Sequence, residues 1–415
     1  MPTSTRRDIF VGAATTWAAM CQVLRAAPSG PGTANEDYWK LLKRQFPLDD
    51  NLLYLNAANV CPASRGVLDR HLEYLRDFQA NPSFQNREKY EALSERAREK
   101  AAQLLGADKD EIAFVRNTSD GSNTVVHGVD LKAGDEIVIT AHNHPSNSDA
   151  WKVLAKRLGL VVKEVPVAVP AVSREHLFDG VEKAVTARTR VIAITHCTST
   201  TGILYPAREI TELARRRGIW MHLDGAQTLG ALDVNLREIG CDSYAGSAHK
   251  WMMGALEAGI LYVRAERIPQ MWPAIVSAAW SDTLVGARKF EVFGQRDDPR
   301  RVAVEAALDF LALVGMPHVE ARMRTLAMRL KQQLHEIPGV ELKTNLEPAL
   351  SGGVVRFNLK SLDPKVAYDK LYQRHRMAIL HTPSGDAQGL RFSPHIYNTI
   401  DEMDRAVAAV REIAG

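Results

Sequence analysis

The stretch Trp220-Met-His-Leu-Asp224-Gly-Ala-Gln227 decides the fold, because a short apolar run ends in an acid, a glycine and an amide. Such a run, bounded by turn residues, is typical of a buried strand. Comparable runs recur between residues 90 and 265 and alternate with helical patterns. This alternation predicts an α/β fold with βαβ units and a mostly parallel sheet. Ligands of such sheets bind beyond the carboxyl ends of the strands, so chemistry is expected in the loops that follow them.

The alternation can be placed along the chain. We expect helices over residues 91–105, 119–128, 148–158 and 206–217. We expect strands over residues 111–115, 136–140, 160–165, 190–196, 220–223 and 259–264. After Pro299 the pattern changes to that of a smaller α+β unit. Its expected helices cover residues 300–314, 318–337 and 400–413, and its expected strands cover 340–344, 354–359, 377–381 and 390–393.

A lysine ends the segment Ser247-Ala-His-Lys250. Small residues beside it let a ligand approach, and a lysine near a strand end can form a Schiff base with an aldehyde. Taken alone, a lysine is normally a solvated surface charge. Asp224 also has two interpretations: it pairs with a protonated pyridine nitrogen, so that the ring takes up electrons, or it forms an Asx turn or a helix N-cap.

Two further segments follow expected strands. In Arg116-Asn-Thr-Ser119, backbone N–H groups and hydroxyls at a helix start suit a phosphate, although a plain capping segment has the same composition. In His142-Asn-His144, an imidazole can stack on a planar cofactor, or the two histidines can bind zinc. The alternative of a metal-dependent hydrolase rests on His142, His144 and Asp149, or on His222 and Asp224.

Together and in this order, the four segments resemble the class V aminotransferase family of fold type I pyridoxal-phosphate enzymes, which includes isopenicillin N epimerase and cysteine desulfurases. The resemblance runs from about Leu53 to the C-terminus, and its most specific parts are residues 224–227 and 247–250. It implies a large domain with a mostly parallel sheet flanked by helices, a smaller α+β C-terminal domain, and pyridoxal 5'-phosphate as the cofactor. It implies Lys250 as the catalytic lysine that holds the cofactor. The other cofactor-binding residues that it implies are Thr118, Ser119, Ser247 and His249 at the phosphate, His144 against the ring, Asp224 at the ring nitrogen and Gln227 at the ring hydroxyl.

The resemblance also implies how a substrate is held. Arg391 matches the family's arginine segment and would clamp the substrate carboxylate with two parallel hydrogen bonds; the alternative is a surface arginine on a strand. Asn147 is expected to face the substrate or the ring. Gln295 stands where a family loop carries a threonine that reaches the neighbouring subunit's phosphate, which leaves that contact open. A homodimer with shared active sites is implied as well.

The cysteines bear on the type of reaction. The segment between His381 and Arg391 holds none, whereas desulfurases need a thiolate there or in a nearby loop. Cys61 is the one candidate near an expected substrate loop, and Cys197 and Cys241 are expected to be buried strand residues. The sequence therefore favours chemistry at the amine-bearing carbon of an amino acid or an amino-acid-containing metabolite, of the aminotransferase or epimerase type. The alternatives are a desulfurase-like C–S lyase, a decarboxylating enzyme, a metal-dependent hydrolase and an inactive binding protein of the same fold.

Composition sets outer limits on partners and location. The chain has 415 residues, a formal net charge of +3 and four cysteines, which excludes a disulfide-dense scaffold and gives no basis for a nucleic-acid partner.

Arg6 and Arg7 precede an apolar stretch and resemble a twin-arginine signal. We expect export by the twin-arginine machinery to the periplasm or the medium, with the cytoplasm as the alternative, and no membrane span in the mature chain. The expected organisation is a signal over 1–27, an N-terminal segment that packs on the small domain over 28–60, a large cofactor domain over 61–298 and a small domain over 299–415.

Overall fold

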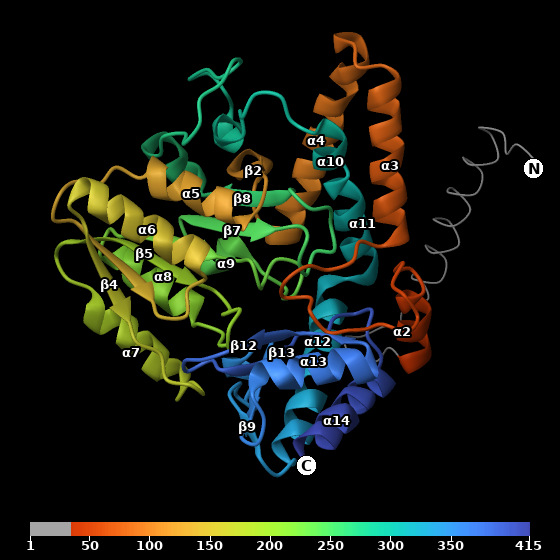
Figure 1. Cartoon of the computed structure of the whole chain (residues 1–415). Helices are drawn as coiled ribbons and strands as arrows, with labels where there is room; N and C mark the ends of the chain where they lie inside the picture. Colours follow the sequence, from red (N-terminus) through yellow and green to blue (C-terminus); the bar gives the residue numbers. More distant parts are fainter. Residues whose placement is uncertain (1–34) are drawn as a thin grey trace, which may run out of the picture.

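The computed structural model describes residues 35–415 (Figure 1). The expected signal over residues 1–27 and Cys21 lie outside the described residues. The α-helices are α2 (Glu36–Lys43), α3 (Arg65–Ala80), α4 (Phe84–Leu105), α5 (Thr118–Gly128), α6 (Pro145–Leu158), α7 (Arg174–Ala184), α8 (Ala207–Arg216), α9 (Leu236–Ile239), α10 (Asp298–Val302), α11 (Val304–Val314), α12 (Met316–His335), α13 (Pro364–His375) and α14 (Ile400–Ala414). The strands are β1 (Leu53–Tyr54), β2 (Ile112–Val115), β3 (Glu136–Thr140), β4 (Val161–Val165), β5 (Thr189–Thr195), β6 (Trp220–Asp224), β7 (Ser243–Ser247), β8 (Gly259–Val263), β9 (Val340–Leu342), β10 (Val355–Leu359), β11 (Met377–Ala378), β12 (Leu380–Thr382) and β13 (Gly389–Phe392).

A seven-stranded sheet forms the centre of the larger unit, with the strand order β2-β8-β7-β6-β5-β3-β4. The pairs β7–β6, β6–β5, β5–β3 and β3–β4 are parallel, and β8 runs antiparallel to both of its neighbours. Since β2 and β7 both oppose β8, they point the same way as the other strands. The carboxyl ends of β2, β3, β5, β6 and β7 therefore meet at one edge of the sheet, and the expectation of a mostly parallel α/β sheet is confirmed.

Alternation along the strands builds a separate core on each face of this sheet. Helices α5 and α6 contribute to one core, and α4, α7, α8 and α11 contribute to the other (Figure 1). Successive side chains of a strand point to opposite faces, so a strand buried on both faces is apolar throughout. Residues of the α5–α6 core include Ala113, Val115, Ile137, Ile139, Val191 and Ala193, and residues of the other core include Ile112, Phe114, Val138, Ile192 and Ile194.

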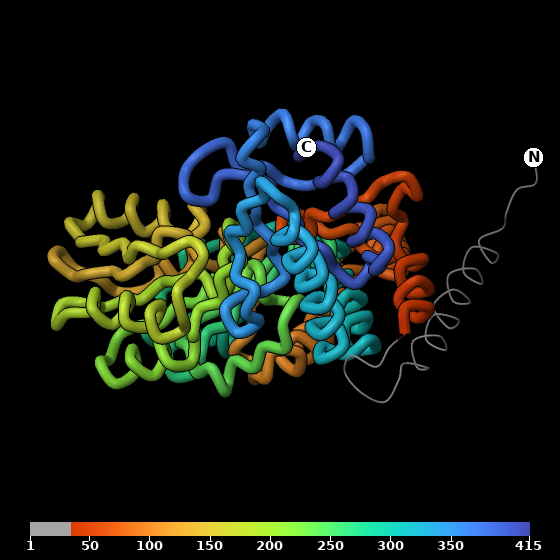
Figure 2. Tube along the Cα trace, turned by 90° about the horizontal axis from the view of Figure 1, so that it is seen from below, coloured from red at the N-terminus to blue at the C-terminus, as the bar shows by residue number. Residues whose placement is uncertain are grey.

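A smaller C-terminal unit carries a four-stranded antiparallel sheet in the order β12-β13-β10-β9. Helices α12, α13 and α14 pack against this sheet, and Leu53 and Leu55 join the same core. The pair β1–β11 ties the start of the described chain to this unit, and in the view from below α2 lies beside α14 (Figure 2). Two ion pairs between α2 and α14 hold them together, Lys40 with Asp401 and Lys43 with Glu402. The N-terminal segment thus packs on the C-terminal unit, while the domain bounds expected from the sequence stay a prediction.

Within residues 35–415, no single helix is long and apolar enough to cross a membrane, and the helix pair Asp298–Val314 and Met316–His335 meets that test only when its two parts, bent by 79°, are joined.

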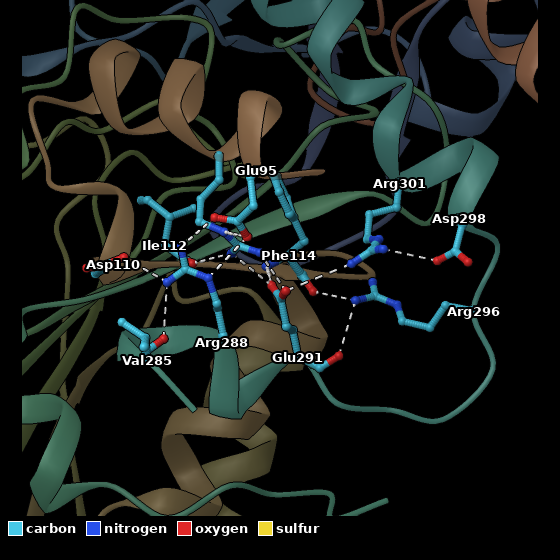
Figure 3. A network of polar contacts seen from close by, with 11 residues as sticks. Glu95, Asp110, Ile112, Phe114, Val285, Arg288, Glu291, Arg296, Asp298 and Arg301 are labelled. Carbon is cyan, nitrogen blue, oxygen red and sulfur yellow. Dashed lines mark hydrogen bonds and ion pairs between the residues drawn. The ribbon is translucent and has the colours of Figure 1, made fainter. Parts of the chain in front are cut away.

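The outer edge of β2 is closed by charged side chains (Figure 3). The Arg98 guanidinium donates to the carbonyl oxygen of Ile112 at 2.6 Å, and the Glu291 carboxylate accepts from the N–H of Phe114 at 2.6 Å. Arg98 and Glu291 also form a bidentate pair, with N–O distances of 2.6 and 3.0 Å. This pair joins α4 and the chain after η3 (Gly286–Phe290) to β2, which leads directly into Thr118.

Most expected elements are confirmed within a few residues, and several differ for a physical reason. The helix expected over 300–314 is two helices, α10 and α11, and the strand expected over 377–381 is split between two sheets as β11 and β12. Helix α3 was not expected, and Val67 is its only fully buried residue. Strand β7, Ser243-Tyr-Ala-Gly-Ser, consists largely of residues that disfavour strands, and burial in the sheet overrides that preference.

We expect Glu291→Gln to lower the free energy of unfolding by about 3 kcal/mol, because it leaves the buried Arg98 cation without its principal counter-charge. Urea unfolding followed by circular dichroism measures the change. Lys365→Met is the matched control, since it breaks the exposed pair with Asp369 and is expected to cost below about 0.5 kcal/mol. Equal losses for the two variants would contradict the importance assigned to the β2 edge.

Candidate active site

The four segments that the sequence marked for cofactor chemistry on the large unit lie at or after the carboxyl ends of strands. Residues 116–119 follow β2, 141–147 follow β3, 224–227 begin at the end of β6, and 247–250 begin at the end of β7. These strands end at the same edge of the sheet, so their loops meet there. The C-terminal unit contributes Arg391 from β13.

Two hydroxyls join the end of β7 to the start of α5. The Thr118 N–H donates to Ser247 Oγ at 2.9 Å, and the hydroxyl oxygens of these residues lie 2.7 Å apart. Asn117 caps the helix by accepting from the Asp120 N–H at 3.0 Å, and Ser119 is half-buried in the first turn. Exposed backbone N–H groups and hydroxyls at a helix N-terminus favour an anion such as phosphate. Thr118 and Ser247, predicted from separate segments, therefore meet in one place.

Asp224 and Gln227 lie buried in the turn after β6. One carboxylate oxygen of Asp224 accepts from the Ala226 N–H at 3.0 Å; Oδ2 accepts no hydrogen bond from residues 35–415. Burial raises the pKa of the Asp224 carboxyl, while Lys250 and His144 act against that rise. Position 225, next to Asp224, requires glycine, because a Cβ there would lie 1.9 Å from the ring of Tyr244.

Gln227 has its amide fixed by two neighbours. Its Nε2 donates to the carbonyl of Ala58 at 3.0 Å, and its Oε1 accepts from the indole N–H of Trp251 at 2.7 Å. An amide nitrogen has two hydrogens, so one donor remains for a ligand. Gln227 thereby sets the orientation of the residue next to Lys250.

The Lys250 amine has no hydrogen-bond or ion-pair partner among the described residues. Burial lowers its pKa below the ordinary value of 10.5; Arg391 lowers it further, and the Asp224 carboxylate opposes this. The Asp224 carboxylate and the Arg391 cation therefore both lie close enough to act on the Lys250 amine. A lysine with a lowered pKa is more often neutral, and the neutral amine is the nucleophile and the base.

His144 and His249 lie close enough to Lys250 for its charge to act on them. His144 caps α6, with its Nδ1 next to the Ser146 hydroxyl at 2.8 Å. Although solvent reaches His144, nearby protein lowers the pKa of its imidazole, and Lys250 adds to this effect. Burial lowers the pKa of His249 to about 4, and its Nδ1 is buried without a partner. Asn147 is fully buried, and both polar atoms of its side chain lack a partner among residues 35–415.

Arg391 is placed by the loop after β5 and by the N-terminal segment. Its Nη1 donates to the carbonyl of Ser199 at 2.9 Å, and its Nη2 donates to Asn56 Oδ1 at 2.9 Å. Burial lowers its pKa to about 9, but the group stays a cation at neutral pH. Its Nε is buried without a partner. A buried cation held only by neutral oxygens suits an incoming carboxylate.

The histidines considered for zinc have other partners. His142 contacts Thr201 Oγ1 at 3.2 Å and the Asp386 carboxylate at 2.9 Å. His222 is buried between the hydroxyls of Ser243 and Ser122, at 2.9 and 3.1 Å. Among residues 35–415, no three histidine, cysteine, aspartate or glutamate side chains are placed to hold a metal ion.

The three described cysteines are buried, as expected for two of them. Cys197 follows β5 and Cys241 precedes β7, so neither is within a strand. Burial raises the pKa of Cys197 to about 12 and that of Cys61 further above its ordinary value. Cys61 packs near Tyr397 and has its N–H bonded to the carbonyl of His249. None of these thiols forms the thiolate readily.

Three contributors to the site were not predicted. Asn56 and the carbonyl of Ala58 come from the N-terminal segment, whose short strand gives little pattern. Arg356 lies opposite Arg391 on β10. A signal for Arg356 exists in the sequence: it is a charged residue within the apolar run Val354-Val-Arg-Phe-Asn-Leu359.

Comparison with known proteins agrees with this geometry. Residues 53–406 match the family described as aminotransferase class-V. Isopenicillin N epimerase of Amycolatopsis lactamdurans is 32% identical over 396 residues, which cover 91% of this chain and 98% of the relative. A probable cysteine desulfurase of Methanothermobacter thermautotrophicus is 27% identical and covers 90% of this chain and 98% of its own. The structure of a C-DES mutant with glycine covalently linked to its PLP cofactor superposes with a TM-score of 0.83 at 22% identity, over 89% of this chain and 99% of that one.

We expect Asp224→Asn to lower the pKa of Lys250 further, because the carboxylate that favours its protonated form is removed. Amine acetylation of Lys250, followed against pH by mass spectrometry in protein free of carbonyl ligands, measures this pKa. The exposed Lys360 in the same digest corrects for reagent. In the wild type, half-maximal reactivity is expected below pH 10.5, and in the variant at a still lower pH. A profile that moves upward or does not move would show that the carboxylate does not act on Lys250.

Proposed function

This chain belongs to the aminotransferase class V family of pyridoxal-phosphate-dependent enzymes, and from that premise we propose that it acts at the amine-bearing carbon of an amino acid or an amino-acid-containing metabolite. The proposed reaction is of the epimerase or aminotransferase type. The observation that carries this proposal is the Lys250 amine, which has no partner among residues 35–415, whose pKa is lowered by burial, and on which the Asp224 carboxylate and the Arg391 cation act.

The residues present fit pyridoxal 5'-phosphate on several independent points. Thr118 and Ser247 form an anion cradle at the start of α5. Oδ2 of the buried Asp224 carboxylate lacks a donor among the described residues, as a site for a protonated ring nitrogen requires. The partnerless Nδ1 of His249 supplies a further buried polar atom. When bound, this cofactor supplies an aldehyde for amines and a ring that takes up charge from a bond broken beside the amine.

The protein groups have distinct tasks in this proposal. Arg391 binds the α-carboxylate and thereby fixes which bonds of the substrate face Lys250. The Lys250 amine takes up or returns the proton at the α-carbon, and its lowered pKa favours the neutral form that acts as a base. The buried Asp224 carboxylate favours a cationic partner, because a buried charge without a counter-charge is costly. Gln227, fixed by Ala58 and Trp251, orients the turn that carries the acid.

A C–S lyase of the desulfurase type is the second candidate, because relatives named cysteine desulfurase match nearly the whole chain. The described residues offer no accessible thiol: the loop over residues 383–388 contains no cysteine, and Cys61, Cys197 and Cys241 are buried. A persulfide-forming reaction is therefore disfavoured, whereas a lyase that needs no protein thiol is compatible with the site.

We also propose export and dimerisation. Export rests on Arg6 and Arg7 before an apolar stretch, and retention of the protein in the cytoplasm of a twin-arginine-competent bacterium would refute it. A homodimer is supported by exposed apolar side chains on one segment, and a monomer in sedimentation velocity would refute it. These side chains are Trp272, Ile275, Val276 and Val285.

We expect the purified protein to be yellow, and borohydride to fix the chromophore covalently on the peptide that contains Lys250. Lys250→Ala is expected to abolish this attachment, while Lys360→Ala retains it, since Lys360 is exposed outside the site. Peptide mass spectrometry locates the attachment. A colourless protein, or unchanged attachment in Lys250→Ala, would contradict the proposed function.

A screen of amino acids separates the reaction types. We expect loss of chirality or keto-acid formation without sulfide, because no described cysteine is accessible to take up sulfur. Chiral chromatography, a keto-acid assay and a sulfide assay on the same incubations measure the three outcomes. Sulfide release from cysteine or cystine would make the C–S lyase the correct assignment.

A further inference from the structure

Two buried arginines face each other across β10 and β13. Arg356 and Arg391 are directly opposite in the antiparallel register, so their side chains leave the same face of the sheet with Cβ atoms roughly 5 Å apart. Arg356 is 1% exposed and Arg391 is 5% exposed. Like charges at opposite positions repel each other, and their burial removes the water that would screen them. The arrangement is therefore unfavourable unless an anion is added.

Other buried arginines of the described chain have that anion built in. Arg98 pairs with Glu291 at 2.6 Å, and Arg322 pairs with Glu36 at 2.8 Å. Neither Arg356 nor Arg391 forms an ion pair with any carboxylate in residues 35–415. The chain thus supplies counter-charges for buried arginines elsewhere and supplies none at this pair.

Both guanidinium groups keep donors that no residue in 35–415 uses. Arg356 donates from Nε to the carbonyl of Thr200 at 2.8 Å, and from Nη1 to Thr382 Oγ1 and the carbonyl of Gly389 at 3.0 and 3.1 Å. A guanidinium has five N–H donors, so both hydrogens of Nη2 remain. Arg391 keeps its Nε, which is buried without a partner. These donors are available to a ligand with two anionic groups.

The pair belongs to the site that contains Lys250. Arg391 lowers the pKa of the Lys250 amine, and Arg356 lowers the pKa of Arg391. The carbonyls that hold the two arginines, those of Ser199 and Thr200, are adjacent in the loop after β5. Arg356 therefore places a second cation beside Arg391, at the end of the site that binds the carboxylate.

We propose that Arg356 binds a second carboxylate and that the substrate is an amino acid whose side chain is itself acidic. This inference rests on the proposed function, in which Arg391 holds the α-carboxylate. Arg356 then selects among amino acids by the charge and length of the side chain, because an uncharged side chain leaves its buried cation without a partner.

The structural alternative is that Arg356 braces the two ends of the loop over residues 383–388 through Thr382 and Gly389. A brace would affect every ligand of the site alike. The ratio of affinities for a diacid and a monoacid of equal length separates the two roles, because only direct binding of the second carboxylate changes that ratio.

Isothermal titration calorimetry of the holoenzyme with linear diacids of four to seven carbons, and with monoacids of the same lengths, measures this ratio. These probes have no amine and are not turned over. We expect one diacid length to bind about ten- to a hundredfold more tightly than its matched monoacid, and Arg356→Met to remove most of that preference. Arg356→Lys is expected to retain part of it, since the charge stays and the planar fork is lost.

Lys360→Met is the control, since it removes one positive charge just beyond β10 from an exposed position and is expected to keep the full preference. A wild-type enzyme that does not distinguish diacids from monoacids would overturn the proposal, whatever the variants do. Undiminished preference in folded Arg356→Met would overturn it as well. Failure of the proposed function is a separate outcome, because a missing chromophore does not prevent the heat of diacid binding from being measured.

Discussion

The burial of charge at the carboxyl edge of one sheet is the constraint on which the rest of this structure depends. Asp224 and Lys250 lie at the ends of the neighbouring strands β6 and β7, Arg391 comes from the C-terminal unit, and both Asp224 and Arg391 act on the pKa of Lys250 at this edge. Their removal from water is costly, and neutral dipoles hold Asp224 and Arg391 in place. Asp224 and Lys250 are placed there by the parallel strands β6 and β7, and Arg391 is placed there by β13 of the C-terminal unit. The packing of the two units therefore determines which charges are buried together in the site.

Much of this arrangement could be predicted from the sequence, because parallel strands buried on both faces leave a clear pattern. The run over residues 136–140 coincides with β3, and the acid at the end of β6 and the lysine after β7 identify the edge that binds a ligand. Thr118 and Ser247 were assigned to one task from separate segments, and their hydroxyls meet in the structure. Short motifs at strand ends are predictable since their geometry is local.

The parts that could not be predicted depend on contacts distant in sequence. Strand β7 is held by pairing with β6 and β8 on its two sides, and α3 buries only Val67 fully. Asn56 reaches Arg391 only because β1 pairs with β11. Arg356 has meaning only once β10 and β13 are placed in register. In each case the sequence shows the type of residue but not the residues that it contacts in the folded chain.

The closed edge of β2 has a consequence for how copies of this chain can associate. An open edge strand offers free N–H and carbonyl groups to any other extended chain, which is a common start of aggregation and of sheets shared between subunits. Here Arg98 and Glu291 already occupy those groups at Ile112 and Phe114. An invading strand would have to separate a buried ion pair before it gained its first hydrogen bond. The contacts that fix β2, the strand before α5, thus also protect this edge of the sheet from fibril-like growth.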